Sequence, residues 1–219
     1  MSVQEICQTP QQAQKEIRSS FSGFLAETQQ HINTAIENVP EMPLPDNKKA
    51  EMRKCLMQEQ AALNRIDKTV LAKLDKPTAI AQLDSAMGSL AENSYKLAQV
   101  KGVTRAFAKA NLAATTGMLY AGIRIEELEG NIMPNRAALK WVVFMEKQHD
   151  FVKTNDPAYI SSKSNRLYNA IHNFYACGIR NSKDTANTSS DMSKSSMVPH
   201  QNKQYQDSTY RAIKTAGKS

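Results

Sequence analysis

The chain has 219 residues, of which 41% are hydrophobic and 22% are charged, and its formal net charge is +7. This length suffices for one domain with a real core, because a domain of about 150 residues already buries roughly 70% of its unfolded surface. Only 6% of the residues are aromatic and eight are glycine, a balance that favours helices over sheets. The longest weakly apolar stretch, residues 112–123, falls well short of the roughly 20 residues that cross a membrane, so we expect no spanning helix.

The net positive charge is divided between the last 39 residues and the rest of the chain. Residues 181–219 hold six Lys or Arg and three Asp or Glu, which gives +3 and leaves +4 for residues 1–180. Because a folded part with this small excess is only mildly basic, we expect no nucleic-acid partner on the ground of net charge.

Cysteine usage and the N-terminus bear on the compartment. Cys7, Cys55 and Cys177 lie far apart, and an odd number argues against a disulfide framework, so we predict three reduced thiols, with Cys55 and Cys177 buried. The first residues contain neither the basic segment nor the apolar run of a secretory signal. These features predict a cytoplasmic location in the producing cell.

Two long helices are predicted in the first third of the chain. Thr9 followed by Pro10 is a strong helix start, because the threonine side chain can accept a bond from the first turn and proline at the first position loses none. An apolar stripe then recurs at steps of three and four residues for about 28 residues. Asp46 offers the N-cap of a second helix of similar length, and we expect the two to form an antiparallel hairpin. The members of the first stripe are Ala13, Ile17, Phe21, Phe24, Thr28, Ile32, Ala35 and Val39.

The middle of the chain predicts one or two further helices. Lys76 followed by Pro77 begins a third helix. Gly102 is either the joint to a fourth helix or a tolerated glycine within one longer helix. Residues 103–129 place small residues at steps of four, which would let another helix approach closely, and Gly130 is a natural left-handed C-cap. These small residues are Ala106, Ala110, Ala114 and Gly122.

Two more helices are predicted before the tail. Pro134 opens a fifth helix with Trp141 and Phe151 among the residues of its inner side. Residues 155–157 repeat the combination of a cap and a proline and begin a sixth helix, in which Ile160 opens the apolar pattern. The pattern ends after Arg180.

The predicted fold is therefore all-α, a bundle of about six helices, several of them long, with antiparallel neighbours. We expect a flexible N-terminus at residues 1–8, a helical bundle domain at 9–180 and a disordered polar tail at 181–219, where large aliphatic residues are scarce. Within the tail, a short amphipathic turn around Tyr205, Tyr210 and Ile213 could fold on a partner.

The sharpest local pattern is Glu146-x-x-His149, because a Glu and a His three apart on a helix face the same way and supply two metal ligands in ferritin-like bundles. Such a site needs a second copy of the motif and two more carboxylates, and neither is evident. A solvated polar face is the alternative interpretation. We expect no cofactor, with Glu146 and His149 as the candidate metal ligands should a metal bind.

Two groups of basic residues form candidate surfaces for a polyanion. Neither group is interleaved with aromatic or amide residues that would stack on or read bases, so a solvated charged face is the alternative. The first group comprises Lys48, Lys49, Arg53 and Lys54, and the second comprises Lys101, Arg105 and Lys109.

The pattern as a whole favours a non-enzymatic adaptor for protein–protein interaction over an enzyme, because no polar residues converge on a recognisable catalytic arrangement. We expect a protein partner, and the narrow stripes of the first two helices, which resemble coiled-coil seams, also allow a homo-oligomer. The alternatives are a metal-binding bundle and a polyanion-binding surface.

In composition alone, a helical body with a tail rich in Ser, Asn and Lys resembles the substrates that some bacteria deliver into host cells through C-terminal signals. This resemblance implies export without an N-terminal signal and a role as an effector.

Overall fold

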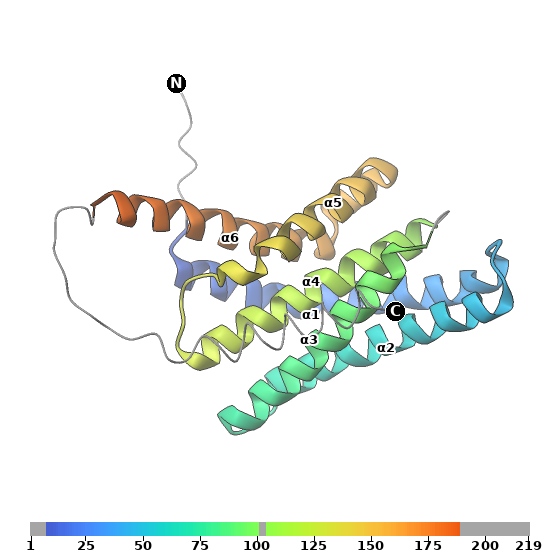
Figure 1. The fold of residues 1–219 in the computed structure, drawn as a ribbon, viewed down its shortest axis with the longest axis horizontal. Coiled ribbons are helices and arrows are strands. Elements are labelled where there is room, and N and C mark those ends of the chain that lie inside the picture. Colours follow the sequence, from blue (N-terminus) through green and yellow to red (C-terminus); the bar gives the residue numbers. More distant parts are fainter. Residues whose placement is uncertain (1–7, 101–103, 189–219) are drawn as a thin grey trace.

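The computed structural model describes residues 8–100 and 104–188, with side chains of the last helix described as far as Gly178. This part of the chain forms six α-helices and three short 3-10 helices and contains no strand, which confirms the all-α prediction (Figure 1). None of the helices in the described ranges combines the length and the apolar character that crossing a membrane requires.

Helix α1 (Pro10–Asn38) begins and ends where the sequence predicts. Thr9 and Gln12 form a reciprocal capping box, in which the Gln12 amide donates to the Thr9 hydroxyl and the Thr9 amide donates to the Gln12 side chain. Every member of the predicted apolar stripe is buried. The 3-10 helix η1 (Val39–Glu41) follows directly, because Pro40 cannot continue the α-helical bonding.

Helix α2 (Asp46–Leu71) runs antiparallel to α1, as predicted. Amide side chains connect the two helices at successive turns: Gln29 donates to Asn64 at 2.7 Å, and Gln60 donates to Asn33 at 3.0 Å. As the residue number rises on one helix it falls on the other, which defines the antiparallel register.

Helices α3 (Lys76–Ala98) and α4 (Arg105–Glu129) are separate, so the alternative of one long helix is wrong. Gly102 itself lies outside the described residues. Ser94 binds Thr115 at 2.7 Å across the antiparallel pair. A Cβ at Gly117 would overlap the Leu63 side chain of α2, so a close approach to α4 depends on this glycine, which was not among the small residues of the prediction.

Helix α5 (Leu139–Asn155) is preceded by η2 (Arg136–Ala138), and α6 (Lys163–Thr188) is preceded by η3 (Pro157–Ser161). Pro157 begins η3, whereas Pro134 lies just before η2. Each α-helix therefore starts later than the sequence predicts. For α6 the start is Lys163, because the Ser162 side chain caps the Asn165 amide at 3.0 Å.

Helix α6 also ends later than predicted, at Thr188 instead of near Arg180. Once a helix is nucleated, each further residue adds a hydrogen bond, so a polar segment can extend it beyond the core. Residues 181–188 of the predicted tail thus belong to α6, and residues 1–7 of the predicted flexible N-terminus (1–8) and residues 189–219 of the predicted tail (181–219) lie outside the described residues.

Helix α4 lies at the centre of the molecule and contacts α1, α2, α3, α5 and α6 (Figure 1). Its residues are buried nearly all the way round, including Phe107, Ala114 and Ile125. Helix α5 packs mainly on α4 and stands at the edge of the bundle, so it covers one side of α4 while α3 covers another.

The core of the described residues contains a carboxyl side chain with no compensating partner. Glu59 on α2 is fully buried, and neither carboxylate oxygen has a hydrogen-bond partner. Desolvation by burial raises the pKa of this carboxyl well above its usual range, so Glu59 is held in its neutral form over a wider pH range than an exposed glutamate.

The two described cysteines are in different states, and Cys7, also predicted to be a reduced thiol, lies outside the described residues. Cys55 is a buried free thiol, as predicted, and burial raises its pKa. Cys177 takes part in a disulfide and is only partly buried, so the prediction of a buried reduced thiol is wrong for this residue. An odd number of cysteines rules out only a framework that uses all of them.

Candidate interaction groove

The predicted metal ligands Glu146 and His149 lie on the same helix, α5, but bind different partners on α6. A carboxylate oxygen of Glu146 lies 2.9 Å from Nε2 of His172. Nε2 of His149 lies 3.0 Å from the side-chain oxygen of Asn165. Each residue thus already has a hydrogen-bond partner that holds α5 against α6.

His149 is also enclosed by aromatic rings. It stacks on Tyr168 with ring centroids 3.7 Å apart and an interplanar angle of 2°, and the ring of Tyr159 meets it edge-on at 5.5 Å. Within the described ranges, no group of three or more His, Cys, Asp or Glu side chains is placed to hold a metal ion. The geometry around these two residues is that of a packed helix–helix contact.

The first basic group, at the start of α2, is partly neutralised. Lys48 forms an ion pair with Glu51 at 2.9 Å, and the Lys49 ammonium donates to the Pro40 carbonyl at 2.7 Å. Arg53 and Lys54 are exposed. This leaves a small cationic surface.

The second basic group, at the start of α4, is also partly neutralised. Lys109 forms an ion pair with Asp156, which precedes η3, and the hydrogen bond and the charge of Lys109 hold the pKa of Asp156 below its usual range. Arg105 lies near the same carboxylate. Lys101 lies outside the described residues.

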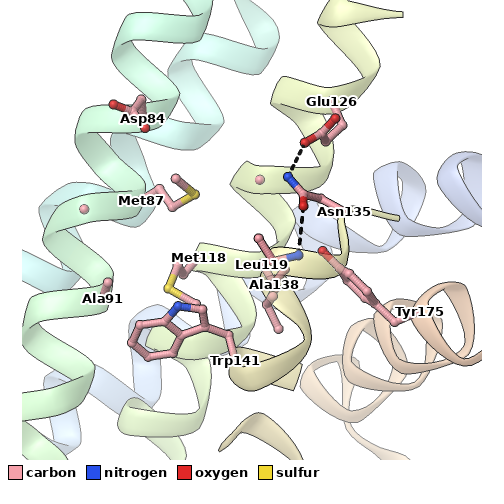
Figure 2. A pocket seen from close by; sticks show the side chains of 13 residues that line it. Asp84, Met87, Ala91, Met118, Leu119, Glu126, Asn135, Ala138, Trp141 and Tyr175 are labelled. Carbon is pink, nitrogen blue, oxygen red and sulfur yellow. Dashed lines mark hydrogen bonds between the residues drawn. The ribbon is translucent and has the colours of Figure 1, made fainter. Parts of the chain in front are cut away.

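A more promising feature lies on the other side of α4, where sequence analysis placed no site. A cavity of about 100 Å³, which we call the first hollow, opens between α3, α4, the start of α5 and α6 (Figure 2). It is lined by Asp84, Met87, Gly88, Ala91, Met118, Leu119, Gly122, Glu126, Asn135, Ala137, Ala138, Trp141 and Tyr175.

The walls of the first hollow are mainly apolar and adaptable. Figure 2 shows Met87 on α3 across the hollow from Met118 and Trp141, which project from α4 and α5. Met side chains adjust their shape to irregular partners. Gly88 borders open space, because a Cβ built there would meet no atom within 4 Å. The indole Nε1 of Trp141 is buried without a hydrogen-bond partner.

The rim of the first hollow carries negative charge. The Glu126 carboxylate accepts hydrogen bonds from the side-chain amides of Asn131 at 2.6 Å and Asn135 at 2.8 Å. The Asn135 oxygen in turn accepts from the Ala137 amide at 2.9 Å, so the loop before α5 is fixed to α4 (Figure 2). Across the hollow, burial raises the pKa of the Asp84 carboxyl.

A second hollow of about 210 Å³ lies further along the same three helices. Both amide atoms of Gln148 are buried there without a hydrogen-bond partner, although the residue as a whole is not fully buried. Phe151 contributes a ring that is 50% exposed, so its predicted place on the inner side of the helix is wrong. The lining residues are Leu97, Ala98, Val100, Phe107, Ala108, Asn111, Phe144, Gln148 and Phe151.

The two hollows lie in line between α3 and α5, with α4 as their floor. Along α3 and α4 they are separated by about ten to twelve residues, or about 15 to 18 Å at the helical rise. Trp141 lines the first hollow and Phe144 the second, and their rings meet edge-on with centroids 5.8 Å apart. We call this surface the α3–α5 groove.

One signal in the sequence could have revealed the groove. Helix α5 buries one apolar stripe that contains Val142, Met145 and Val152. Trp141, Phe144 and Phe151 form a second apolar face, which lines the two hollows. A surface helix needs only one apolar face to pack on the core of its own domain. The second apolar face of α5 therefore indicates a surface that could bind a partner.

Comparison of the chain with models of protein families, with curated proteins and with solved structures gives no match.

Proposed function

We propose that this protein is a non-enzymatic interaction module that binds an amphipathic helix of a protein partner in the α3–α5 groove. The observation that carries the proposal is the pair of apolar hollows in line along α4, each walled by α3 on one side and α5 on the other. A helix laid in a groove inserts apolar side chains from successive turns, which is a recurrent mode of peptide recognition.

The groove sets the pattern of the partner helix. Hollows about 15 to 18 Å apart match apolar residues ten to twelve positions apart, so we expect anchors at positions i, i+4, i+7 and i+11 of a helix of about four turns. The Met87 and Met118 side chains that line the first hollow can adapt to anchors of different shape.

The chemistry of the lining supports binding rather than catalysis. Asp84 and Glu126 stand at the rim of the first hollow, and Glu126 is already bonded by two amides. The second hollow offers an amide, Gln148, as its most buried polar group without a partner. An amide orients a ligand by hydrogen bonding but does not transfer protons near neutral pH.

The proposal is tested by selecting helical peptides that bind the full-length protein. A library of helices of about 20 residues, randomised at the anchor positions, would be panned against the protein, and binding would be followed by the fluorescence of Trp141, the only tryptophan in the sequence. We expect large apolar side chains at the selected anchors.

A matched pair of variants ties that binding to the groove. Gly88→Leu fills open space in the first hollow and should weaken binding about tenfold or more. Ala81→Leu introduces the same side chain at an exposed position of α3 that lines neither hollow, and it should leave binding unchanged. Peptides that bind both variants equally well would show that the groove is not the binding site.

The two alternative functions and the export hypothesis stay predictions with separate measurements. Elemental analysis of the purified protein tests the metal hypothesis at Glu146 and His149. A filter-binding assay at two salt concentrations tests the polyanion hypothesis, because phosphate binding weakens steeply with salt. A translocation reporter joined upstream of residues 200–219, with and without that segment, tests export.

A further inference from the structure

The C-terminal tail of this chain contains a segment with the residue pattern of an amphipathic helix. Residues 205–216 lie outside the described part of the chain, and their sequence is YQDSTYRAIKTA. If this segment is helical, its small and apolar residues at positions i, i+4, i+7, i+8 and i+11 fall on one side. These residues are Tyr205, Thr209, Ala212, Ile213 and Ala216.

We propose that residues 205–216 bind as an amphipathic helix in the α3–α5 groove of the same chain, with Ile213 in the first hollow and Tyr205 in the second. The proposal rests on the proposed function, because it names an occupant of the same groove. The tail is then an internal ligand that a partner helix must displace.

The two hollows match the two anchors in size and chemistry. The smaller hollow, about 100 Å³, suits the aliphatic side chain of Ile213, and the larger, about 210 Å³, suits the ring of Tyr205. The tyrosine hydroxyl would meet the unpartnered amide of Gln148, which satisfies both polar groups.

The two anchors are closer together than the roughly ten to twelve positions that the hollows match, and the length of the tyrosine side chain makes up the difference. Tyr205 and Ile213 are eight residues apart, or about 12 Å along a helix, whereas the hollows are about 15 to 18 Å apart. Helical side chains lean toward the N-terminus of their helix, so the long side chain of Tyr205 extends away from Ile213 and covers the remaining distance.

Charge sets the direction in which the segment lies. The acidic groups Asp84 and Glu126 stand at the rim of the first hollow. In the tail, Arg211 and Lys214 flank Ile213, so placing Ile213 in that hollow brings the two cations nearest to the two carboxylates. Long Arg and Lys side chains can reach a rim from the outward side of a bound helix.

The connection is long enough. Helix α6 contributes Tyr175 to the first hollow and continues to Thr188, about 20 Å further along its axis. The 17 residues from Thr188 to Tyr205 span up to about 55 Å when extended, more than the roughly 38 Å needed to return to the first hollow and reach the second. A tethered ligand of this kind acts at an effective concentration of the order of millimolar, so weak contacts suffice to fill the groove.

The experiment uses the full chain and the fluorescence of Trp141, which lines the first hollow. Ile213→Asp places a charge on the bound face of the segment. We expect the emission to shift to longer wavelength and acrylamide quenching to rise about twofold, because the indole loses apolar cover. Thr215→Asp makes the same change of charge on the outward side of the segment and should leave both readouts unchanged.

A second measurement tests whether the tail segment, added as a separate peptide, covers Trp141 again. A synthetic peptide of residues 200–219, added to the Ile213→Asp chain, should restore the original emission, and it should fail to do so when Gly88→Leu is also present. Identical spectra for the wild-type and Ile213→Asp chains, together with no response to the peptide, would overturn the proposal. A spectral change that depends on protein concentration would assign the groove to the tail of a second copy and also overturn it.

Failure of this inference is distinguishable from failure of the proposed function. If library peptides bind the groove and are blocked by Gly88→Leu while Ile213→Asp has no effect, the groove serves external helices only. If neither the library nor the tail responds to Gly88→Leu, both proposals fall.

Discussion

Helices α1 to α4 and the α3–α5 groove use the same kinds of side chain in opposite ways. In the four-helix part, Phe21 stacks on Tyr120 with centroids 3.8 Å apart, and Phe24 is fully buried. Along α5, Phe151 is half exposed and Trp141 borders open space. The difference teaches that the core is closed by α1 to α4 together with α6, whereas α5 adds one wall of a surface that the packing of the chain leaves uncovered.

The largest expected effect contrasts two phenylalanines. Phe24→Ala empties a fully buried site and should lower the free energy of unfolding by about 3 to 5 kcal/mol. Phe151→Ala removes a half-exposed ring and should cost about 1 kcal/mol or less. Urea unfolding followed by circular dichroism measures both. Equal losses would mean that the groove is as well packed as the core.

Two glycines give the next contrast. A Cβ at Gly117 overlaps Leu63, so Gly117→Leu should destabilise the protein by about 1 to 3 kcal/mol through overpacking. At Gly88 the same substitution enters open space and replaces a poor helix former, so stability should rise by up to about 1 kcal/mol. Thermal unfolding of the two variants gives the sign of each change. A loss of stability at Gly88 would indicate that the first hollow is closed in solution.

Glu59 makes the stability of the core depend on pH. Because its pKa in the folded state is raised, its contribution is fully present below the pKa of the unfolded chain, about 4.5, and is lost as the pH rises through the folded pKa. Glu59→Gln keeps the shape and cannot ionise, so it should lose less stability than wild type as the pH is raised. Parallel slopes of unfolding free energy against pH would contradict a neutral, buried Glu59.

The smallest expected effect lies in the second hollow. Gln148→Leu removes two buried amide atoms that have no partner, so stability should stay within about 1 kcal/mol of wild type or rise slightly. Differential scanning calorimetry is the check. A loss of several kcal/mol would show that Gln148 has partners in solution that link the helices, and would remove it as a free group of the groove.

Much of the fold could be predicted from periodicity and caps. The stripe of α1 was predicted residue by residue, because each member faces a core on a long, regular helix whose start is fixed by Thr9 and Pro10. The start of α5 was predicted too early because Pro134 lies in the loop before η2. The start of α6 was predicted too early because Pro157 begins a 3-10 helix, whose first turn accepts proline as well as that of an α-helix does. The pattern of residues alone does not distinguish the two.

The candidate site could be predicted far less well. The spacing of Glu146 and His149 correctly places both on one helix, but their partners His172 and Asn165 come from another helix, and no local pattern specifies that pairing. The groove was missed because it exists only between helices. Trp141 and Phe151 read as core residues in a sequence, since periodicity shows which side of a helix is apolar but not whether anything covers it.

By itself, the sequence determined the helical class, the order of the helices, the caps at Thr9 and Gly130 and the buried side of α1, because these depend on residues within a few turns of one another. Only the tertiary structure decided that α4 is central, that Glu59 is sealed in the core and that α3 and α5 stand apart over α4. These features depend on distances between segments far apart in the chain. Such distances are fixed by packing, not by local backbone preference.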